Sequence, residues 1–215
     1  MRLNINIPTR GRPQKLSQCL KSIDYVGDMK IFLCCYCQRE DIPLKLPDLP
    51  IEIIEDPDML TIESHNLICR QPGHFMGLSD DIEFFPVALN EAVYALECVY
   101  GGYGALDFVV ANMDSPDGCY MLLSDDFIEG FPGRQPYCPE YKFMFASAEL
   151  RDYAKSINCF YRCHDAKLNH YHPAVTGQAD RTHDRIRSKG VINHDQAIYA
   201  RRKANGDLWS HSVKG

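Results

Sequence analysis

Apolar and polar positions in the first half of the chain predict short strands that alternate with helices. The apolar stretches predict four strands, over residues 2–8, 30–37, 51–54 and 75–78. Apolar residues at helical spacing predict two helices between them, one that begins near Pro13 and one over residues 61–69. This alternation indicates an α/β fold with a mostly parallel, Rossmann-like central sheet flanked by helices.

The pattern continues after Pro86 without a domain boundary. A helix of regular apolar period follows this proline and ends at the glycine pair 101–102. A buried strand is expected over residues 107–111, and residues 118–128 predict a strand or hairpin that includes Phe127 and Ile128. No repeat or low-complexity tract interrupts the chain, so we expect a single domain.

Two further helices are predicted from residues that commonly cap helices. Ser147 is the expected N-cap of a helix with four buried positions, Leu150, Tyr153, Ala154 and Ile157. Asn193 is the expected N-cap of another helix, which places Asp195 in the first turn. The helix dipole stabilises a carboxylate there, so both a capping role and a catalytic role are open for Asp195.

Composition narrows the classes of function. The 215 residues are 45% hydrophobic and carry a net charge of −6 without a basic tract, so nucleic acid is not expected as the principal partner. No stretch approaches the roughly 20 apolar residues that span a bilayer, and the first residues lack the apolar core of a signal peptide. We therefore expect a cytoplasmic protein with reduced thiols. The ten cysteines include a C-x-x-C at 34–37 and Cys159 and Cys163, which could form a zinc site but are interpreted as core.

The first candidate functional residues are Asp80 and Asp81, which follow the buried strand 75–78. The carboxyl edge of an open α/β sheet is where ligands bind. Two adjacent carboxylates repel each other unless a cation or hydrogen-bond donors compensate, and a hard divalent metal is the simplest compensation. A solvated acidic turn is the alternative interpretation. The pair Asp125 and Asp126 resembles this one and is interpreted as a turn or an acceptor-site candidate.

The turn Pro8-Thr9-Arg10-Gly11-Arg12-Pro13 supplies basic groups after the first strand. A turn of this kind places backbone N–H groups and guanidinium groups beside a helix N-terminus, where anions are favoured. The alternative is an ordinary loop with solvated arginines. Residues 130–141 form a proline-rich loop with aromatic side chains, a plausible substrate-facing lid.

Together these motifs resemble the GT-A class of nucleotide-sugar glycosyltransferases, and within it they look most like a viral glycosyltransferase domain. The turn at 8–13 is similar to the nucleotide-binding opening of the class, and Leu78-Ser79-Asp80-Asp81 is similar to its D-x-D motif, with Ser79 in place of the first acid. His194-Asp195-Gln196 resembles the Asp-Gln element near the sugar in retaining families. His211 and Lys214 resemble a C-terminal metal ligand and a phosphate-binding lysine.

The resemblance implies that a hexose is transferred from a UDP-sugar to a glycan or glycoprotein acceptor, with retention of configuration and with Mn²⁺ or Mg²⁺. It implies a nucleotide-binding half over 1–100 and an acceptor and sugar half with the C-terminal tail over 101–215. It assigns catalysis to Asp195 and Gln196, and the metal to Asp81, Asp80 and His211, with His170 or His172 as the alternative imidazole donors. The nucleotide-sugar would contact Pro8, Thr9, Arg10, Arg12, Asp56, Asp80 and Lys214.

Two other functions fit parts of the same pattern. A sugar-1-phosphate nucleotidyltransferase shares the sheet, the metal carboxylates and a basic loop after the first strand, but its loop is richer in glycine. A catalytically inactive module that binds a nucleotide or a glycan would retain the site without turnover. The three functions differ in what they release. A nucleotidyltransferase releases pyrophosphate, a glycosyltransferase releases UDP, and a binding module releases neither.

Overall fold

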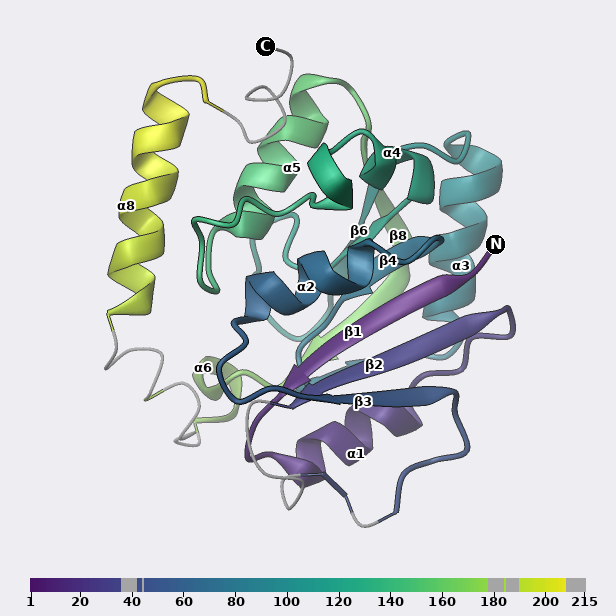
Figure 1. Cartoon of the computed structure of the whole chain (residues 1–215). Coiled ribbons are helices and arrows are strands. Elements are labelled where there is room, and N and C mark those ends of the chain that lie inside the picture. The colour runs from purple at the N-terminus through teal and green to yellow at the C-terminus, as the bar shows by residue number, and fades with distance from the viewer. Residues whose placement is uncertain (36–41, 44, 178–183, 185–189, 208–215) are drawn as a thin grey trace.

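An eight-stranded sheet forms the centre of the chain, with the strand order β3-β2-β1-β4-β7-β6-β8-β5 (Figure 1). The computed structural model describes residues 1–35, 42–43, 45–177, 184 and 190–207. The strands are β1 Leu3–Thr9, β2 Met29–Cys35, β3 Ile51–Glu55, β4 His74–Gly77, β5 Ile82–Phe84, β6 Ala105–Val110, β7 Met121–Leu123 and β8 Phe160–His170. The first four strands in chain order pair in parallel, as the sequence predicts. The other half is mixed, because β7 is antiparallel to β4 and β6, and β5 is antiparallel to β8.

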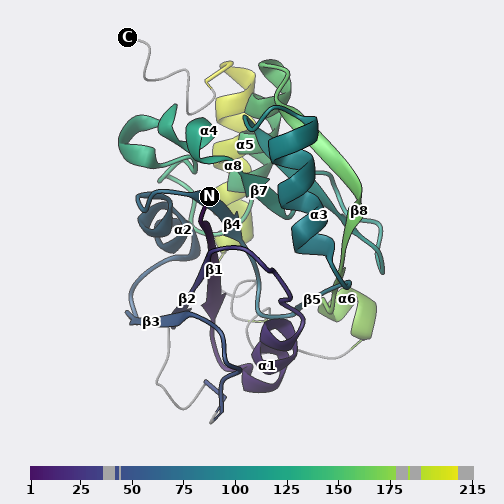
Figure 2. The ribbon, with the colours of Figure 1, turned by 90° about the vertical axis from the view of Figure 1, so that its right-hand side faces the viewer.

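Helices cover both faces of this sheet (Figures 1 and 2). The helices are α1 Pro13–Lys21, α2 Thr61–Cys69, α3 Ala88–Tyr94, α4 Asp125–Glu129, α5 Ala146–Ser156, α6 Pro173–Thr176 and α8 Val191–Ala204, with short π and 3₁₀ turns η2 Ala95–Val99 and η3 Pro132–Arg134. One apolar core joins α1 and α3 to the sheet, and a second core joins α2, α4 and α5 to the other face. No helix in the described part of the chain is both long and apolar enough to cross a bilayer.

Strand β1 shows how the sequence produces two covered faces. Leu3, Ile5 and Ile7 are fully buried in the core with α1. The alternating residues Asn4 and Asn6 are also buried, and the Asn6 amide donates to Ser64 Oγ on α2 at 2.9 Å. A central strand buried on both sides therefore carries hydrogen-bonded polar groups on one face.

Several elements agree with the prediction, and others do not. The predicted strands at 2–8 and 51–54 and the helix at 61–69 are confirmed, and β2 ends at Cys35 within the described residues. Phe127 and Ile128 were expected in a strand or hairpin, but they are buried in α4, because the Ser124 side chain caps that helix. The helix after Pro86 is confirmed, although its last turn widens into the π turn η2.

The predicted N-caps Ser147 and Asn193 are wrong. Helix α5 begins one residue before Ser147, after Phe145 in the left-handed region with φ of 64°. Helix α8 begins after Gly190, which has φ of 63°. In both cases a residue with positive φ turns the chain into the helix, and polar caps are not used. Ile157, predicted to be buried, is 38% exposed just beyond α5.

Candidate functional site

The basic turn and the acid pair meet at the carboxyl ends of β1 and β4. These two strands are parallel neighbours, so Thr9 at the end of β1 lies beside the residues that follow β4. Thr9 Oγ1 donates to Asp80 Oδ2 at 2.7 Å. Arg12 forms an ion pair with Asp80, and its Nη1 lies 3.0 Å from Asp81 Oδ2. The structure therefore brings Thr9 and Arg12 together with Asp80 and Asp81, although Thr9 and Asp80 are 71 positions apart in the sequence.

Burial excludes the solvated-turn interpretation of the acid pair. Asp80 is 0% exposed and Asp81 is 2% exposed. Burial raises the pKa of the Asp80 carboxyl to about 6, although the Arg12 charge acts in the opposite direction. Burial alone would also raise the pKa of Asp81, but hydrogen bonding from His170 and the charge of Arg12 hold that pKa well below its usual range. The pKa of Asp81 therefore lies below that of Asp80, and Asp81 keeps its charge to lower pH.

Strand β8 brings an imidazole to the same place. His170, the last residue of β8, lies with Nε2 3.3 Å from Asp81 Oδ1. Its backbone N–H donates to Asn112 Oδ1 at 2.9 Å, and its backbone oxygen accepts from the Asn112 amide at 3.1 Å. The Tyr171 N–H donates to the Asp81 backbone oxygen at 2.8 Å. The His172 ring packs edge-on against His170, at 5.3 Å between ring centroids.

Two hydroxyl groups complete the surroundings of Asp81. Ser79 Oγ donates to Asp81 Oδ1 at 2.6 Å and lies 2.9 Å from the Tyr120 hydroxyl. Tyr120 precedes β7 and also packs edge-on against the His170 ring. Tyr120 and Asn112 are contributions that the sequence analysis missed, and no local motif marks them, because they reach the site only through the pairing of β6, β7 and β8.

The donor chemistry at this place fits a divalent cation. Carboxylate oxygens and imidazole nitrogens are ligands of Mn²⁺, and Asp81 and His170 already lie together. Asp80 is adjacent but pairs with Arg12. Among the residues that the structure describes, no group of three His, Cys, Asp or Glu side chains is arranged to hold a metal ion. The predicted third donor, His211, lies outside those residues.

Asp195 occupies an anchoring position on α8. Its carboxylate is 0% exposed and accepts hydrogen bonds from the backbone N–H groups of Lys142, Phe143 and Met144, the last two at 2.8 Å. It also lies 2.8 Å from Nδ1 of His194. The carboxylate therefore holds the segment that leads into α5, and it lies in the second turn of α8, beyond the predicted first turn. Its neighbour Gln196 is exposed.

The remaining predicted nucleotide-sugar residues lie on the same edge of the sheet or outside the described part. Pro8 is in β1 and Arg10 follows that strand. Asp56 follows β3, which runs parallel to β2 and β1, and its Oδ1 accepts from the backbone N–H groups of Asp58 and Met59. Lys214, His211 and the rest of the predicted C-terminal tail lie outside the described residues.

Other candidate groups have structural roles. Asp125 accepts from the Gly73 N–H at 2.9 Å and pairs with Arg134, so the second acid pair begins α4. Cys34, Cys159 and Cys163 are buried in the core, as interpreted. The loop 130–141 contributes four buried side chains to the second core, those of Phe131, Tyr137, Cys138 and Tyr141.

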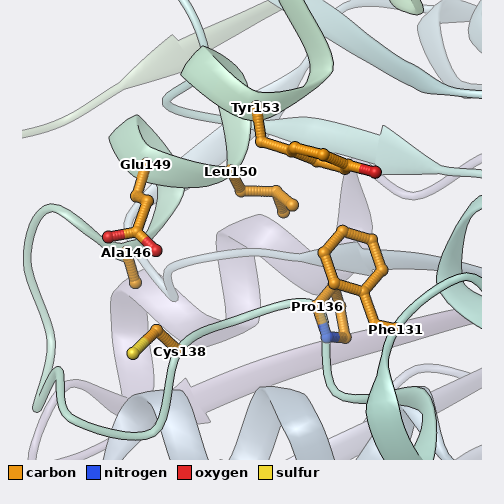
Figure 3. Close-up of a pocket in the computed structure, with 7 residues that line it drawn as sticks. All are labelled: Phe131, Pro136, Cys138, Ala146, Glu149, Leu150 and Tyr153. Atoms are coloured by element: carbon orange, nitrogen blue, oxygen red, sulfur yellow. The ribbon is translucent and has the colours of Figure 1, made fainter. Parts of the chain in front are cut away.

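A hollow between this loop and α5 is not the site. Its lining includes Phe131, Leu150, Tyr153 and Glu149 (Figure 3). It has no room for a water molecule. Glu149 accepts hydrogen bonds from Tyr141 at 2.6 Å and from Arg202 at 2.8 Å, so its carboxylate is already satisfied within the fold.

The comparison with solved structures defines the class of fold. The neighbours of this domain are GT-A glycosyltransferases, so the chain has the GT-A fold that its motifs indicate. One of them is S. aureus TarS 1–349, with a TM-score of 0.57 at 10% sequence identity over 82% of this chain and 62% of that one. TarS 1–349 in complex with UDP gives a TM-score of 0.55 at 10% identity, over 78% of this chain and 59% of that one. The chain is thus considerably shorter than the TarS fragment.

At this identity the likeness shows the fold alone. No protein-family model and no curated protein matches the sequence. The function of this chain has to be argued from its own residues.

Proposed function

We propose that this chain is a metal-dependent glycosyltransferase that transfers a hexose from a UDP-sugar to a glycan or glycoprotein acceptor, with retention of configuration. One observation carries the proposal. Thr9 at the end of β1 and Arg12 just after it converge with Asp80 and Asp81, which follow β4, within hydrogen-bond distance at the carboxyl edge of the sheet. This is the edge at which open α/β sheets bind ligands. The UDP complex of a protein with the same fold supports the choice of nucleotide.

The proposal gives the basic turn the task of binding the nucleotide diphosphate. Arg12 precedes α1, so a bound phosphate would meet both a guanidinium group and the N-terminal end of that helix. Pro8, Thr9 and Arg10 would line the nucleotide, with Asp56 on the ribose side. Lys214 would add a point charge to the diphosphate.

The proposed cofactor is Mn²⁺ or Mg²⁺, held by Asp81 with help from Asp80. Two residues are candidates for the imidazole donor. The resemblance favours His211, and the contact with Asp81 favours His170. When bound, the ion supplies stabilisation for the negative charge on the leaving diphosphate. The hydrogen bond from Ser79 and the imidazole of His170 orient the Asp81 carboxylate toward that role.

Retention is proposed on the resemblance of residues 194–196 to retaining families. Asp195 and Gln196 are the proposed catalytic side chains. The hydrogen bonds of Asp195 hold the segment before α5, so Asp195 would also position that segment beside the sugar. The anomeric configuration of the product, read by ¹H NMR coupling constants, tests retention directly.

A thermal-shift screen of nucleotides and nucleotide sugars, with and without Mn²⁺, tests the proposal. A ligand that binds only the folded state raises the melting temperature, and the shift grows with the ratio of ligand concentration to Kd. We expect UDP and a UDP-sugar to stabilise the protein more with Mn²⁺ than without it, and the same UDP-sugar to release UDP when an acceptor is present. Release of pyrophosphate from a nucleoside triphosphate would indicate a nucleotidyltransferase, and UDP binding without turnover would indicate a binding module.

A further inference from the structure

Arg12 occupies the position that a cation at this site requires. Its guanidinium pairs with Asp80 and reaches Asp81 at 3.0 Å, and its side chain is only 12% exposed. The two carboxylates therefore already have a counter-ion within the protein. Among the described residues, Thr9 also donates to Asp80, and Ser79 and His170 contact Asp81.

The backbone of Arg12 is fixed by the fold, so its side chain is the part that could change partners. The Arg12 carbonyl accepts the hydrogen bond from the Leu16 N–H that begins α1, at 3.0 Å. Gly11, with φ of 66°, makes the preceding turn in the left-handed region that favours glycine. An exchange of ionic partners by Arg12 thus needs side-chain rotation alone.

We propose that Arg12 and a divalent cation are alternative counter-ions for Asp80 and Asp81, and that a nucleotide diphosphate draws Arg12 away as the cation binds. This inference rests on the proposed function. A cation that arrives alone has to displace Arg12 and leaves its guanidinium without an anion in a largely buried place. A diphosphate supplies that anion, and guanidinium binds phosphate oxygens in a bidentate manner.

The exchange makes the cation and the nucleotide bind cooperatively. Such coupling is reciprocal, so the nucleotide must strengthen cation binding by the same factor as the cation strengthens nucleotide binding. Part of the coupling comes from direct contact between the cation and the phosphates. The part due to Arg12 is lost when Arg12 is removed.

Titration of Mn²⁺ alone, followed by the loss of its free-ion EPR signal, tests the exchange. The wild-type protein should bind Mn²⁺ weakly without nucleotide. Arg12→Ala should bind Mn²⁺ about ten- to hundredfold more tightly, which is the range that corresponds to one charge-assisted hydrogen bond. The same variant should bind UDP more weakly in the absence of metal, and UDP should strengthen its Mn²⁺ binding by a smaller factor.

Two further variants make the test specific. Arg12→Lys keeps a positive charge but cannot bridge both carboxylates, so it should show an intermediate gain in Mn²⁺ affinity and remains informative if the alanine variant does not fold. Arg2→Ala removes a guanidinium from the other end of β1, where Arg2 pairs with Asp28 at the surface. This control should bind Mn²⁺ like the wild type.

Equal Mn²⁺ affinity of the wild type and both Arg12 variants would overturn the exchange. Failure of the proposed function would look different. No UDP-sugar would then stabilise the wild type even with Mn²⁺, whereas the Mn²⁺ titrations without nucleotide would still report whether Arg12 competes for the carboxylates.

Discussion

His65 is a buried neutral imidazole that should make the protein sensitive to acid. It lies on α2, its Nδ1 is 2.9 Å from the Asn6 amide nitrogen, and its ring packs where a side chain at Gly77 would be, 2.8 Å from an added Cβ. Burial lowers the pKa of His65 to about 3. Because Asn6 donates to Nδ1, the neutral ring is the form that fits.

We expect His65 to reduce stability as the pH falls below its unfolded pKa of 6.5. Between pH 6.5 and about 3 the unfolded state binds a proton that the folded state does not, so the unfolding free energy falls by up to about 1.4 kcal/mol per pH unit. At pH 5 the loss should be about 2 kcal/mol. Urea unfolding of the wild type and His65→Gln across pH 5–7.5 measures it. If the free-energy difference between the two proteins does not change with pH, His65 is already protonated or exposed in solution.

Whether Asp81→Asn raises or lowers the stability of the protein depends on neighbours of Asp81 that the sequence does not reveal. Repulsion between adjacent carboxylates suggests that Asp81→Asn stabilises the protein without metal. The structure reverses this expectation, because Ser79, Arg12 and His170 all favour ionised Asp81 and lower its pKa. The depressed pKa contributes stability that is fully present above the unfolded value of 3.8 and is lost as pH falls further.

Asp81→Asn should therefore lower the unfolding free energy by about 1–3 kcal/mol at pH 7 without metal, and should abolish Mn²⁺-dependent binding of UDP. Thermal unfolding and UDP titration measure the two effects. Asp126→Asn, which changes an exposed acid on α4, is the matched control and should alter neither. Unchanged affinity for UDP in Asp81→Asn would refute the metal assignment.

At the scale of elements, local pattern predicted the first half of the fold well. Alternating Leu3, Ile5 and Ile7 identify β1, and helical spacing identifies α1, because each element buries one apolar face in the predicted period. Strand β8 was missed, since exposed polar residues such as His164 and Asp165 break its apolar alternation. Its extended form depends on pairing with β6 and β5, which no local signal specifies.

Helix α8 depends on two buried polar contacts that tie it to α5 and to the segment before it. Asp195 accepts three backbone N–H groups, and Arg202 makes a bidentate pair with Glu149 at 2.8 and 3.1 Å. The view in Figure 1 shows α8 standing beside α5 at the side of the domain. Loss of Asp195 would leave three backbone N–H groups without their carboxylate partner.

Asp195→Ala is expected to lower the unfolding free energy by about 1–3 kcal/mol, because three partly buried backbone N–H groups lose the hydrogen bonds to its carboxylate. Asp195→Asn should cost less, since its amide oxygen still accepts a hydrogen bond. The exposed neighbour Gln196 provides the control, and Gln196→Ala should leave the melting temperature unchanged. A melting temperature unaffected in Asp195→Ala, together with lost transfer activity, would assign Asp195 to catalysis alone.

At the scale of the whole molecule, the site could be predicted in part. The turn at 8–13 and the acid pair are local motifs at the ends of predicted strands, and parallel pairing of β1 and β4 makes them neighbours. His170 reaches Asp81 through β8, so its contact required the long-range topology. Asn112 and Tyr120 carry no motif at all. The predicted viral resemblance and the roles of residues 211 and 214 stay predictions.

The imidazole donor can be identified by comparing two variants. If the contact with Asp81 reflects the metal site, His170→Ala should weaken Mn²⁺ binding in the presence of UDP about tenfold or more, while His211→Ala has little effect. Isothermal titration of Mn²⁺ into each UDP-bound variant measures this. The reverse ranking would assign the ligand to the tail, and deletion of residues 209–215 should then reduce turnover more than melting temperature.

The antiparallel pairing of β5 with β8 also sets the time at which this site can assemble during protein synthesis. Ile82 pairs with His170, so the strand that follows the acid pair finds its partner only after 88 further residues have been made. Contacts between distant parts of a chain form slowly, because a long loop must close first. A nascent chain can thus fold β1, α1 and β2 early, while its carboxylates gain their imidazole neighbour among the last steps. Ribosome-bound fragments that end before β8 should therefore display the basic turn without a complete site.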